Sequence, residues 1–294
     1  MTNPVIIIGM HRSGTSLLTE LLEELGLFVG AQKDQHSESL FFQDLNKWIF
    51  EQCGARWDTP SAVDYLWENQ NLLQAVEDYV RNLVESPRVV RYLGQRLFWT
   101  NRAVTRLTLP WGWKDPRNTF TLPLWLRIFP EAKVLHIKRH GVDVAQSLVV
   151  RSRNGQAETL EKYQKYRRFV FFRPKRGGFM ESPRCAKVSG GFSLWNEYLE
   201  KAGALVENLA KNQVLELKYE DLVTDIGTHL TAAANFCELD AAPDQIRALA
   251  SNVRASRVYS FLRDPALIRF AERHESELNI YNYDQMLSAN WKEK

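Results

Sequence analysis

A short apolar run that ends in a glycine-bounded turn constrains the fold more than any other feature of this 294-residue chain. Residues 5–8 are four consecutive β-branched residues, and Gly9 and Gly14 bracket the polar turn that follows. Leucines then recur at helical spacing, at Leu17, Leu18, Leu21, Leu22 and Leu25. The pattern predicts a buried strand, a tight loop and a helix.

The turn contains the residues needed to hold an anion. Glycine lets the backbone curl so that several N–H groups point inward, and the N-terminus of the following helix adds partial positive charge. Gly9, Gly14 and Thr15–Ser16 have the spacing of a phosphate-binding P-loop. The nucleotide-hydrolysing P-loop has Lys before the final Ser or Thr, but here Thr15 takes that place and Arg12 is the cation in the loop. We therefore expect a bound anion other than a magnesium triphosphate.

Strand–loop–helix patterns recur along the chain. Apolar runs at 111–113, 132–139 and 213–218 read as further strands, and helices are expected at about 119–129 and 142–150. Such alternation predicts an α/β fold with a parallel sheet flanked by crossover helices.

The remaining segments are predicted to be mostly helical. We expect helices at 40–53, 63–84, 158–170 and 193–209, and a helical C-terminal part from about 228, broken near Pro243 and Pro265. The sequence shows no internal repeat, so the prediction is one domain spanning 1–294.

Composition excludes several classes of protein. A net charge of +3 does not favour a general nucleic-acid binder. Cys53, Cys185 and Cys237 show neither a disulfide framework nor a zinc pattern, and no metal site is expected. No apolar stretch reaches the length of a membrane span. We expect a soluble cytoplasmic protein, or a soluble piece of a larger one.

Three segments together resemble the sulfotransferases that use 3′-phosphoadenosine 5′-phosphosulfate (PAPS), with further likeness to bacterial members. They are Gly9–Leu18, Val134–Leu148 and Lys218–Leu222. The resemblance implies a three-layer fold of the kind found in P-loop nucleoside-triphosphate hydrolases. It also implies transfer of a sulfuryl group from PAPS to a hydroxyl or amine acceptor by in-line displacement, with adenosine 3′,5′-bisphosphate as product.

The same resemblance implies a set of cofactor-binding residues. The 5′-phosphosulfate would be held by Arg12, Ser13, Gly14, Thr15 and Ser16. Arg139 and Ser147, eight residues apart, would bind the 3′-phosphate, and Tyr219 would contact the adenine. Arg254 and Arg257 could add charge near the 3′-phosphate.

Sulfuryl transfer requires neutralisation of charge on the transferring group and a base for the acceptor. Lys114 ends the second expected strand, and the resemblance implies a transition-state cation there. The base is less defined, because many bacterial members have Glu where this chain has Gln43. Glu38 is the first candidate catalytic base and His36 the second, and Asp44 and His11 remain open.

The segment at about 151–190 is expected to form a basic helical and loop lid. Residues 151–188 contain eleven Lys or Arg against three Glu, so the segment could attract an anionic acceptor or an acidic lipid surface. The acceptor could be a small molecule, a glycan or a lipid. Two other functions stay open, a P-loop kinase or nucleotide hydrolase and a non-catalytic nucleotide-binding domain.

Overall fold

The computed structural model describes residues 2–172, 175, 177–253 and 255–283. The chain divides into two compact units, one of residues 1–139 with 198–258 and the other of residues 140–197 with 259–294. The expectation of a single domain stays a prediction.

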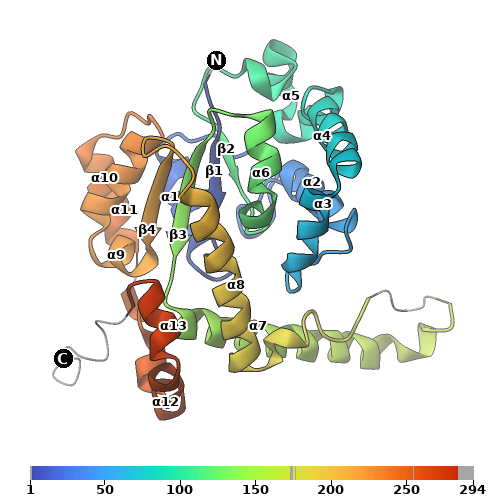
Figure 1. The fold of residues 1–294 in the computed structure, drawn as a ribbon, viewed down its shortest axis with the longest axis vertical. Helices are drawn as coiled ribbons and strands as arrows, with labels where there is room; N and C mark the ends of the chain where they lie inside the picture. Colours follow the sequence, from blue (N-terminus) through green and yellow to red (C-terminus); the bar gives the residue numbers. More distant parts are fainter. Residues whose placement is uncertain (1, 173–174, 176, 254, 284–294) are drawn as a thin grey trace. The chain divides into compact units, whose positions relative to one another are not determined.

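The first unit is built on a four-stranded parallel sheet (Figure 1). The strands are β1 (Val5–Ile8), β2 (Gly112–Lys114), β3 (Lys133–Lys138) and β4 (Val214–Lys218), in the order β2-β1-β3-β4. Ile7 lies beside Lys114 on one side and Leu135 on the other, so the central strand brings the loop after it next to the ends of its neighbours. The predicted parallel α/β sheet is confirmed.

Alternating side chains of β1 enter two different cores. Ile6 and Ile8 pack on one face of the sheet, whereas Val5 and Ile7 pack on the other, as the two-residue period of a strand requires. The first face is covered by α2 (Leu40–Glu51), α4 (Gln70–Val84), α5 (Val90–Asn101), α6 (Asn118–Ile128) and the end of α8 (Val188–Val206). The second is covered by α1 (Thr15–Glu24), α9 (Tyr219–Thr224), α10 (Ile226–Phe236) and α11 (Pro243–Asn252). These helices and the sheet form the predicted three layers.

The second unit is helical. It contains α7 (Gly141–Tyr166), the start of α8, α12 (Pro265–Arg273) and α13 (Glu275–Ile280). Buried Asp143 accepts hydrogen bonds from Ser260 Oγ at 2.8 Å and Phe261 N at 2.9 Å, and the ring of His140 stacks on Phe261. None of the helices in the described ranges combines the length and apolar character needed to cross a bilayer.

Two sets of predicted helix bounds were wrong. The expected helix at 63–84 is interrupted at Asn69, whose extended backbone separates α3 (Asp64–Glu68) from α4. The Asn69 side chain accepts a hydrogen bond from Leu72 N at 3.1 Å and so caps α4. In contrast, the helices expected at 142–150 and 158–170 are one continuous α7 up to Tyr166.

Candidate active site

The loop after β1 has a backbone that only glycine tolerates at two places. Gly9 and Gly14 have φ of 142° and 91°, in the range that L side chains rarely adopt. A Cβ on Gly9 would lie 2.5 Å from the carbonyl oxygen of Ile137, and one on Gly14 would lie 2.3 Å from Cδ2 of Tyr219. The loop is therefore closely packed on the end of β3 and on the start of α9.

The N-terminus of α1 fits a bound anion. Gly14 is its N-cap residue, and no side chain in the described part of the chain caps this end. The first N–H groups of a helix have no partner within the helix, so a phosphate or sulfate oxygen can accept from them. The Ser13 hydroxyl is buried and finds no hydrogen-bond partner among the described residues. An orphaned hydroxyl beside the first N–H groups of a helix suits a bound phosphate or sulfate group.

Lys114 brings a buried cation to this loop. It is the last residue of β2 and is 2 % exposed. Its Nζ donates to the carbonyl oxygen of His36 at 2.6 Å, to Oε1 of Glu38 at 3.0 Å and to Oγ of Ser16 at 3.4 Å. Because Ser16 lies in the first turn of α1, the ammonium group is positioned at the anion-binding end of that helix.

Glu38 is a buried carboxyl with an unusual titration. Its Oε2 accepts from Nε2 of Gln43 at 2.8 Å and lies 3.7 Å from Nη2 of Arg117. Burial, followed by the negative charge of Asp115, raises the pKa of Glu38 above that of an ordinary glutamate, although Lys114 opposes the rise. A raised carboxyl pKa is the property expected of a general base in a closed site.

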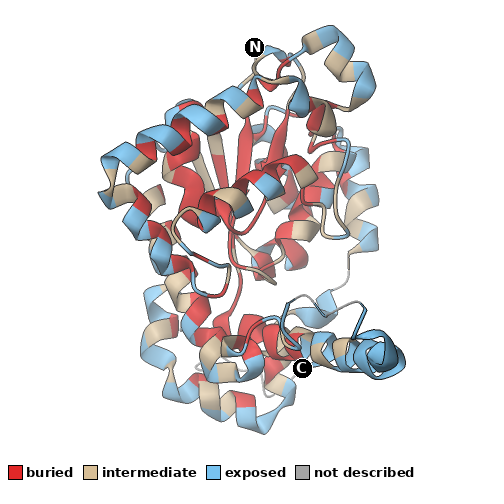
Figure 2. Cartoon of the chain, turned by 90° about the vertical axis from the view of Figure 1, so that its right-hand side faces the viewer, coloured by how far each residue is buried: buried red, intermediate tan, exposed pale blue. Residues whose placement is uncertain are grey.

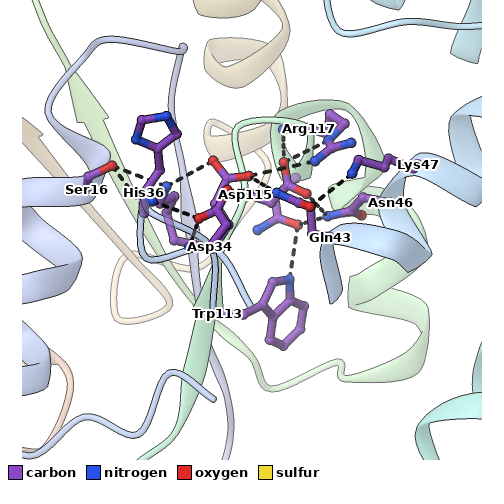
Figure 3. A network of polar contacts seen from close by, with 12 residues as sticks. Ser16, Asp34, His36, Gln43, Asn46, Lys47, Trp113, Asp115 and Arg117 are labelled. Atoms are coloured by element: carbon purple, nitrogen blue, oxygen red, sulfur yellow. Dashed lines mark hydrogen bonds and ion pairs between the residues drawn. The ribbon is translucent and has the colours of Figure 1, made fainter. Parts of the chain in front are cut away.

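Asp34 and Gln43 hold the loop that carries Glu38. Asp34 Oδ1 accepts from the backbone N–H groups of His36 at 2.8 Å and Glu38 at 2.9 Å, and Gln43 Nε2 also donates to Asp34 Oδ2 (Figure 3). Burial alone would raise the pKa of Asp34, but these N–H groups and the charge of Lys114 lower it overall. Asp34 therefore stays ionised and fixes the backbone on which Glu38 sits.

A second set of buried polar residues continues from this loop. Arg117 Nε donates to Asp115 Oδ1 at 2.9 Å, and Asn46 Nδ2 donates to Asp115 Oδ2 at 3.0 Å (Figure 3). Asn46 Oδ1 in turn accepts from Thr121 and Trp125. The sequence prediction gave these residues no role. Asp115 and Arg117 follow Lys114 closely in the sequence, whereas Asn46 in α2 lies far from them along the chain.

The other base candidates lie in less suitable surroundings. The imidazole of His36 points away from Gln43 and Asp115, and it is the backbone of His36 that contacts Lys114 (Figure 3). Asp44 is half-exposed and pairs with Arg91. His11 packs edge-on against Trp57, with ring centroids 4.9 Å apart. Among the four candidates, the geometry favours Glu38.

Arg139 and Tyr219 come together beside the loop. The Arg139 guanidinium lies 4.6 Å from the centroid of the Tyr219 ring and donates to the carbonyl oxygens of Arg12 at 3.2 Å and Arg257 at 2.6 Å. Ser147 belongs to α7 in the second unit, so its pairing with Arg139 stays a prediction. Arg254 lies outside the described residues.

Comparison with known proteins identifies the family. The chain matches a model of the sulfotransferase family over residues 4–244, and it therefore belongs to that family. A solved sulfotransferase from Alicyclobacillus acidocaldarius is 14% identical, with 99% of this chain and 98% of that chain covered and a TM-score of 0.50. Identity this low shows the fold alone.

Two further solved structures are similar at a lower level. A sulfotransferase domain from the curacin biosynthetic pathway is 15% identical, with 93% of this chain and 97% of that chain covered and a TM-score of 0.48. A mouse sulfotransferase complexed with PAP is 13% identical, with 89% of this chain and 66% of that chain covered and a TM-score of 0.40. No curated protein gives a significant sequence match.

Proposed function

We propose that this protein transfers a sulfuryl group from PAPS to a hydroxyl or amine acceptor by in-line displacement. The observation that carries the proposal is the position of Lys114, whose Nζ contacts both Ser16 at the start of α1 and the carboxyl of Glu38. A single site thus combines an anion-binding helix end, a buried cation and a buried carboxyl.

Each of these groups has a role in the proposed reaction. When bound, PAPS supplies the sulfuryl group and the leaving phosphate. The N–H groups of Gly14, Thr15 and Ser16 and the hydroxyls of Ser13 and Thr15 hold the 5′ anion, and Lys114 neutralises the negative charge that develops there. Glu38 takes the proton from the acceptor hydroxyl as the new O–S bond forms. Arg12 adds positive charge to the loop.

The nucleotide end is assigned to residues beside the loop. We assign the 3′-phosphate to Arg139 and Ser147 and the adenine to Tyr219. The contacts of Arg139 with the Tyr219 ring and with the Arg12 carbonyl support this assignment. The Tyr219 ring also packs directly against Gly14 in the loop. The acceptor is assigned no further than a small-molecule, glycan or lipid hydroxyl or amine.

Calorimetry followed by a transfer assay tests the proposal. Adenosine 3′,5′-bisphosphate should bind tightly without magnesium, and ATP should bind weakly with or without it. Labelled PAPS should then yield labelled product from a mixture of phenols, glycans, lipids and peptides. Tight magnesium-dependent ATP binding would instead support the kinase or hydrolase, and bisphosphate binding without transfer to any acceptor would support a non-catalytic domain.

Replacement of the cation provides the residue-level test. Lys114→Ala should keep bisphosphate affinity within severalfold, because the loop N–H groups remain, but lose most turnover. A matched control is Lys211→Ala, which removes an exposed lysine outside the polar network around Glu38. Equal transfer rates for Lys114→Ala and the unchanged protein would refute the role of Lys114.

A further inference from the structure

The C-terminal half of α7 and the turn after it expose aromatic and basic side chains together. Every residue from Leu160 to Phe172 is exposed (Figure 2). We call residues 159–172 with Lys175 and Phe179 the aromatic–basic segment. Its aromatic residues are Tyr163, Tyr166, Phe169, Phe171, Phe172 and Phe179, and its basic residues are Lys162, Lys165, Arg167, Arg168 and Lys175. Glu161 is the one acidic residue within it.

The segment forms a shallow apolar groove. Thr159, Lys162, Tyr163 and Tyr166 recur at helical spacing along one face, and with Phe169, Val170, Phe172 and Lys175 they line a hollow of about 900 Å³. The ring of Phe179 packs 5.2 Å from that of Tyr163, so the chain folds back along the helix. Exposed apolar patches rimmed by polar side chains are typical of protein or membrane interaction sites.

The tip of the segment indicates what it binds. Phe171 and Phe172, in the turn after α7, are 90% and 79% exposed, and Arg167 and Arg168 directly precede that turn. Aromatic side chains among lysines and arginines are the composition of helices that lie in a membrane interface. There the rings enter the boundary between headgroups and acyl chains, and the cations contact anionic headgroups.

We propose that the aromatic–basic segment binds the surface of a lipid bilayer that contains anionic lipids. A soluble polyanion would neutralise the basic side chains but leave Phe171 and Phe172 in water. An anionic bilayer accommodates the basic side chains and the two phenylalanines together, because its charge lies at the surface and its apolar region lies directly beneath. The segment would thus hold the enzyme at a membrane surface without spanning it.

Co-sedimentation of the full chain with vesicles tests this proposal. The protein should bind vesicles of phosphatidylcholine mixed with phosphatidylserine, and bind vesicles of phosphatidylcholine alone far more weakly. Binding should weaken at high salt, since screening reduces the electrostatic part. Lys165→Gln with Arg168→Gln should lower affinity about thirtyfold, since each cation near an anionic surface contributes about 1 kcal/mol. Phe171→Ser with Phe172→Ser should lower it about tenfold or more.

Matched variants outside the segment serve as controls. Arg106→Gln with Lys211→Gln removes the same charge from exposed positions of the first unit, and Trp99→Ser removes an exposed aromatic that is 67% exposed. Both should bind anionic vesicles as the unchanged protein does. Circular dichroism confirms that each variant is folded. Equal losses in the controls, failure to bind either vesicle, or binding to heparin without binding to vesicles would each overturn the proposal.

Discussion

Opposing effects act on the pKa of Glu38. Burial disfavours the charged carboxylate, and the two neighbouring cations favour it. The residue is 6% exposed, and its two carboxylate oxygens lie 3.0 Å from Lys114 Nζ and 3.7 Å from Arg117 Nη2. Burial and Asp115 prevail, so its pKa is raised. A base with a raised pKa becomes protonated, and therefore inactive, at a higher pH than an exposed glutamate would.

The transfer rate should consequently fall on the acidic side as Glu38 takes up a proton. Glu38→Gln keeps the shape and a hydrogen-bond acceptor for Lys114, but its amide cannot accept the proton of the acceptor. We expect kcat to fall about 10²- to 10⁴-fold and the acidic limb of the pH–rate profile to disappear. The measurement is kcat against pH with labelled PAPS. The control is Asp44→Asn, which alters a half-exposed alternative candidate for the base and should leave kcat and the pH–rate profile unchanged. An unaltered pH–rate profile for Glu38→Gln would show that Glu38 is not the base.

Replacing Gly14 and Gly26 by alanine distinguishes the cost of backbone strain from the cost of a steric clash. Both have positive φ, 91° and 105°, but a Cβ on Gly14 would strike the Tyr219 ring, whereas a Cβ on Gly26 would meet nothing within 4 Å. Gly26→Ala should cost about 1 kcal/mol of unfolding free energy from strain alone. Gly14→Ala should cost about 1–3 kcal/mol more, because Tyr219 must move. Denaturant unfolding of both variants measures the difference, and equal losses would contradict the Tyr219 contact.

At the residue scale, the sequence indicated candidate site residues only where neighbouring residues in the chain mark the position. Gly14, Ser16 and Lys114 were singled out because each stands at the end of a strand or the start of a helix, and the structure brings Lys114 into contact with Ser16. Gln43 was dismissed because an amide cannot act as a base, yet it donates to Glu38 and Asp34. Asn46 and Asp115 were missed because they meet across 69 residues of chain, and no local pattern encodes that contact.

At the scale of elements, the pairing of β3 with β4 includes one buried histidine contact. Glu216 Oε2 lies 2.9 Å from His136 Nδ1 and 3.1 Å from Lys138 Nζ. The hydrogen bond from His136 is the main cause that lowers the pKa of Glu216 to about 2. A carboxyl whose pKa is lowered in the folded state stabilises the fold above its unfolded pKa, and this stabilisation is lost as the pH falls toward 2.

Glu216→Gln should therefore destabilise the protein at neutral pH and less so in acid. We expect a loss of about 1 kcal/mol at neutral pH, kept modest because the side chain is 41% exposed, and a narrowing difference below about pH 4.5. Urea unfolding at several pH values provides the measurement. Glu238→Gln, which breaks the exposed pair with Lys133, should cost less than about 0.5 kcal/mol. A Glu216→Gln deficit that stays constant with pH would argue against this account.

The spacing of apolar residues predicted the four strands but not the bounds of two helical regions. The four strands were predicted because each is a short apolar run bounded by turn residues. The break at Asn69 was missed because apolar residues continue at helical spacing on both sides of it, although Asn is a strong capping residue. The continuous α7 was missed for the opposite reason. Residues 151–157 carry no apolar stripe and include Asn154 and Gly155, which are poor helix formers, yet the helix continues through them.

At the scale of the whole molecule, the proposed sulfuryl-transfer residues and the proposed membrane-binding segment belong to two different units. The loop, Lys114 and Glu38 belong to the first unit, and the aromatic–basic segment belongs to the second. The fold class and the loop could be predicted because the strand–loop–helix pattern repeats along the chain. The role of the basic segment could not, because a charge count does not reveal which aromatic side chains the structure leaves exposed.

Hydrogen exchange should therefore show two separate footprints on the same protein. At about one hundred times its dissociation constant, adenosine 3′,5′-bisphosphate adds about 2.7 kcal/mol to the folded state. The largest slowing should fall on amides at the start of α1, at 14–17, because the proposed function directs the anion to these N–H groups. Anionic vesicles should slow exchange within 160–172 instead. Gly14→Ala should reduce only the footprint of the nucleotide. Lys165→Gln with Arg168→Gln should reduce only the footprint of the vesicles. Loss of both footprints in either variant would show that the two sites were wrongly assigned to separate ligands.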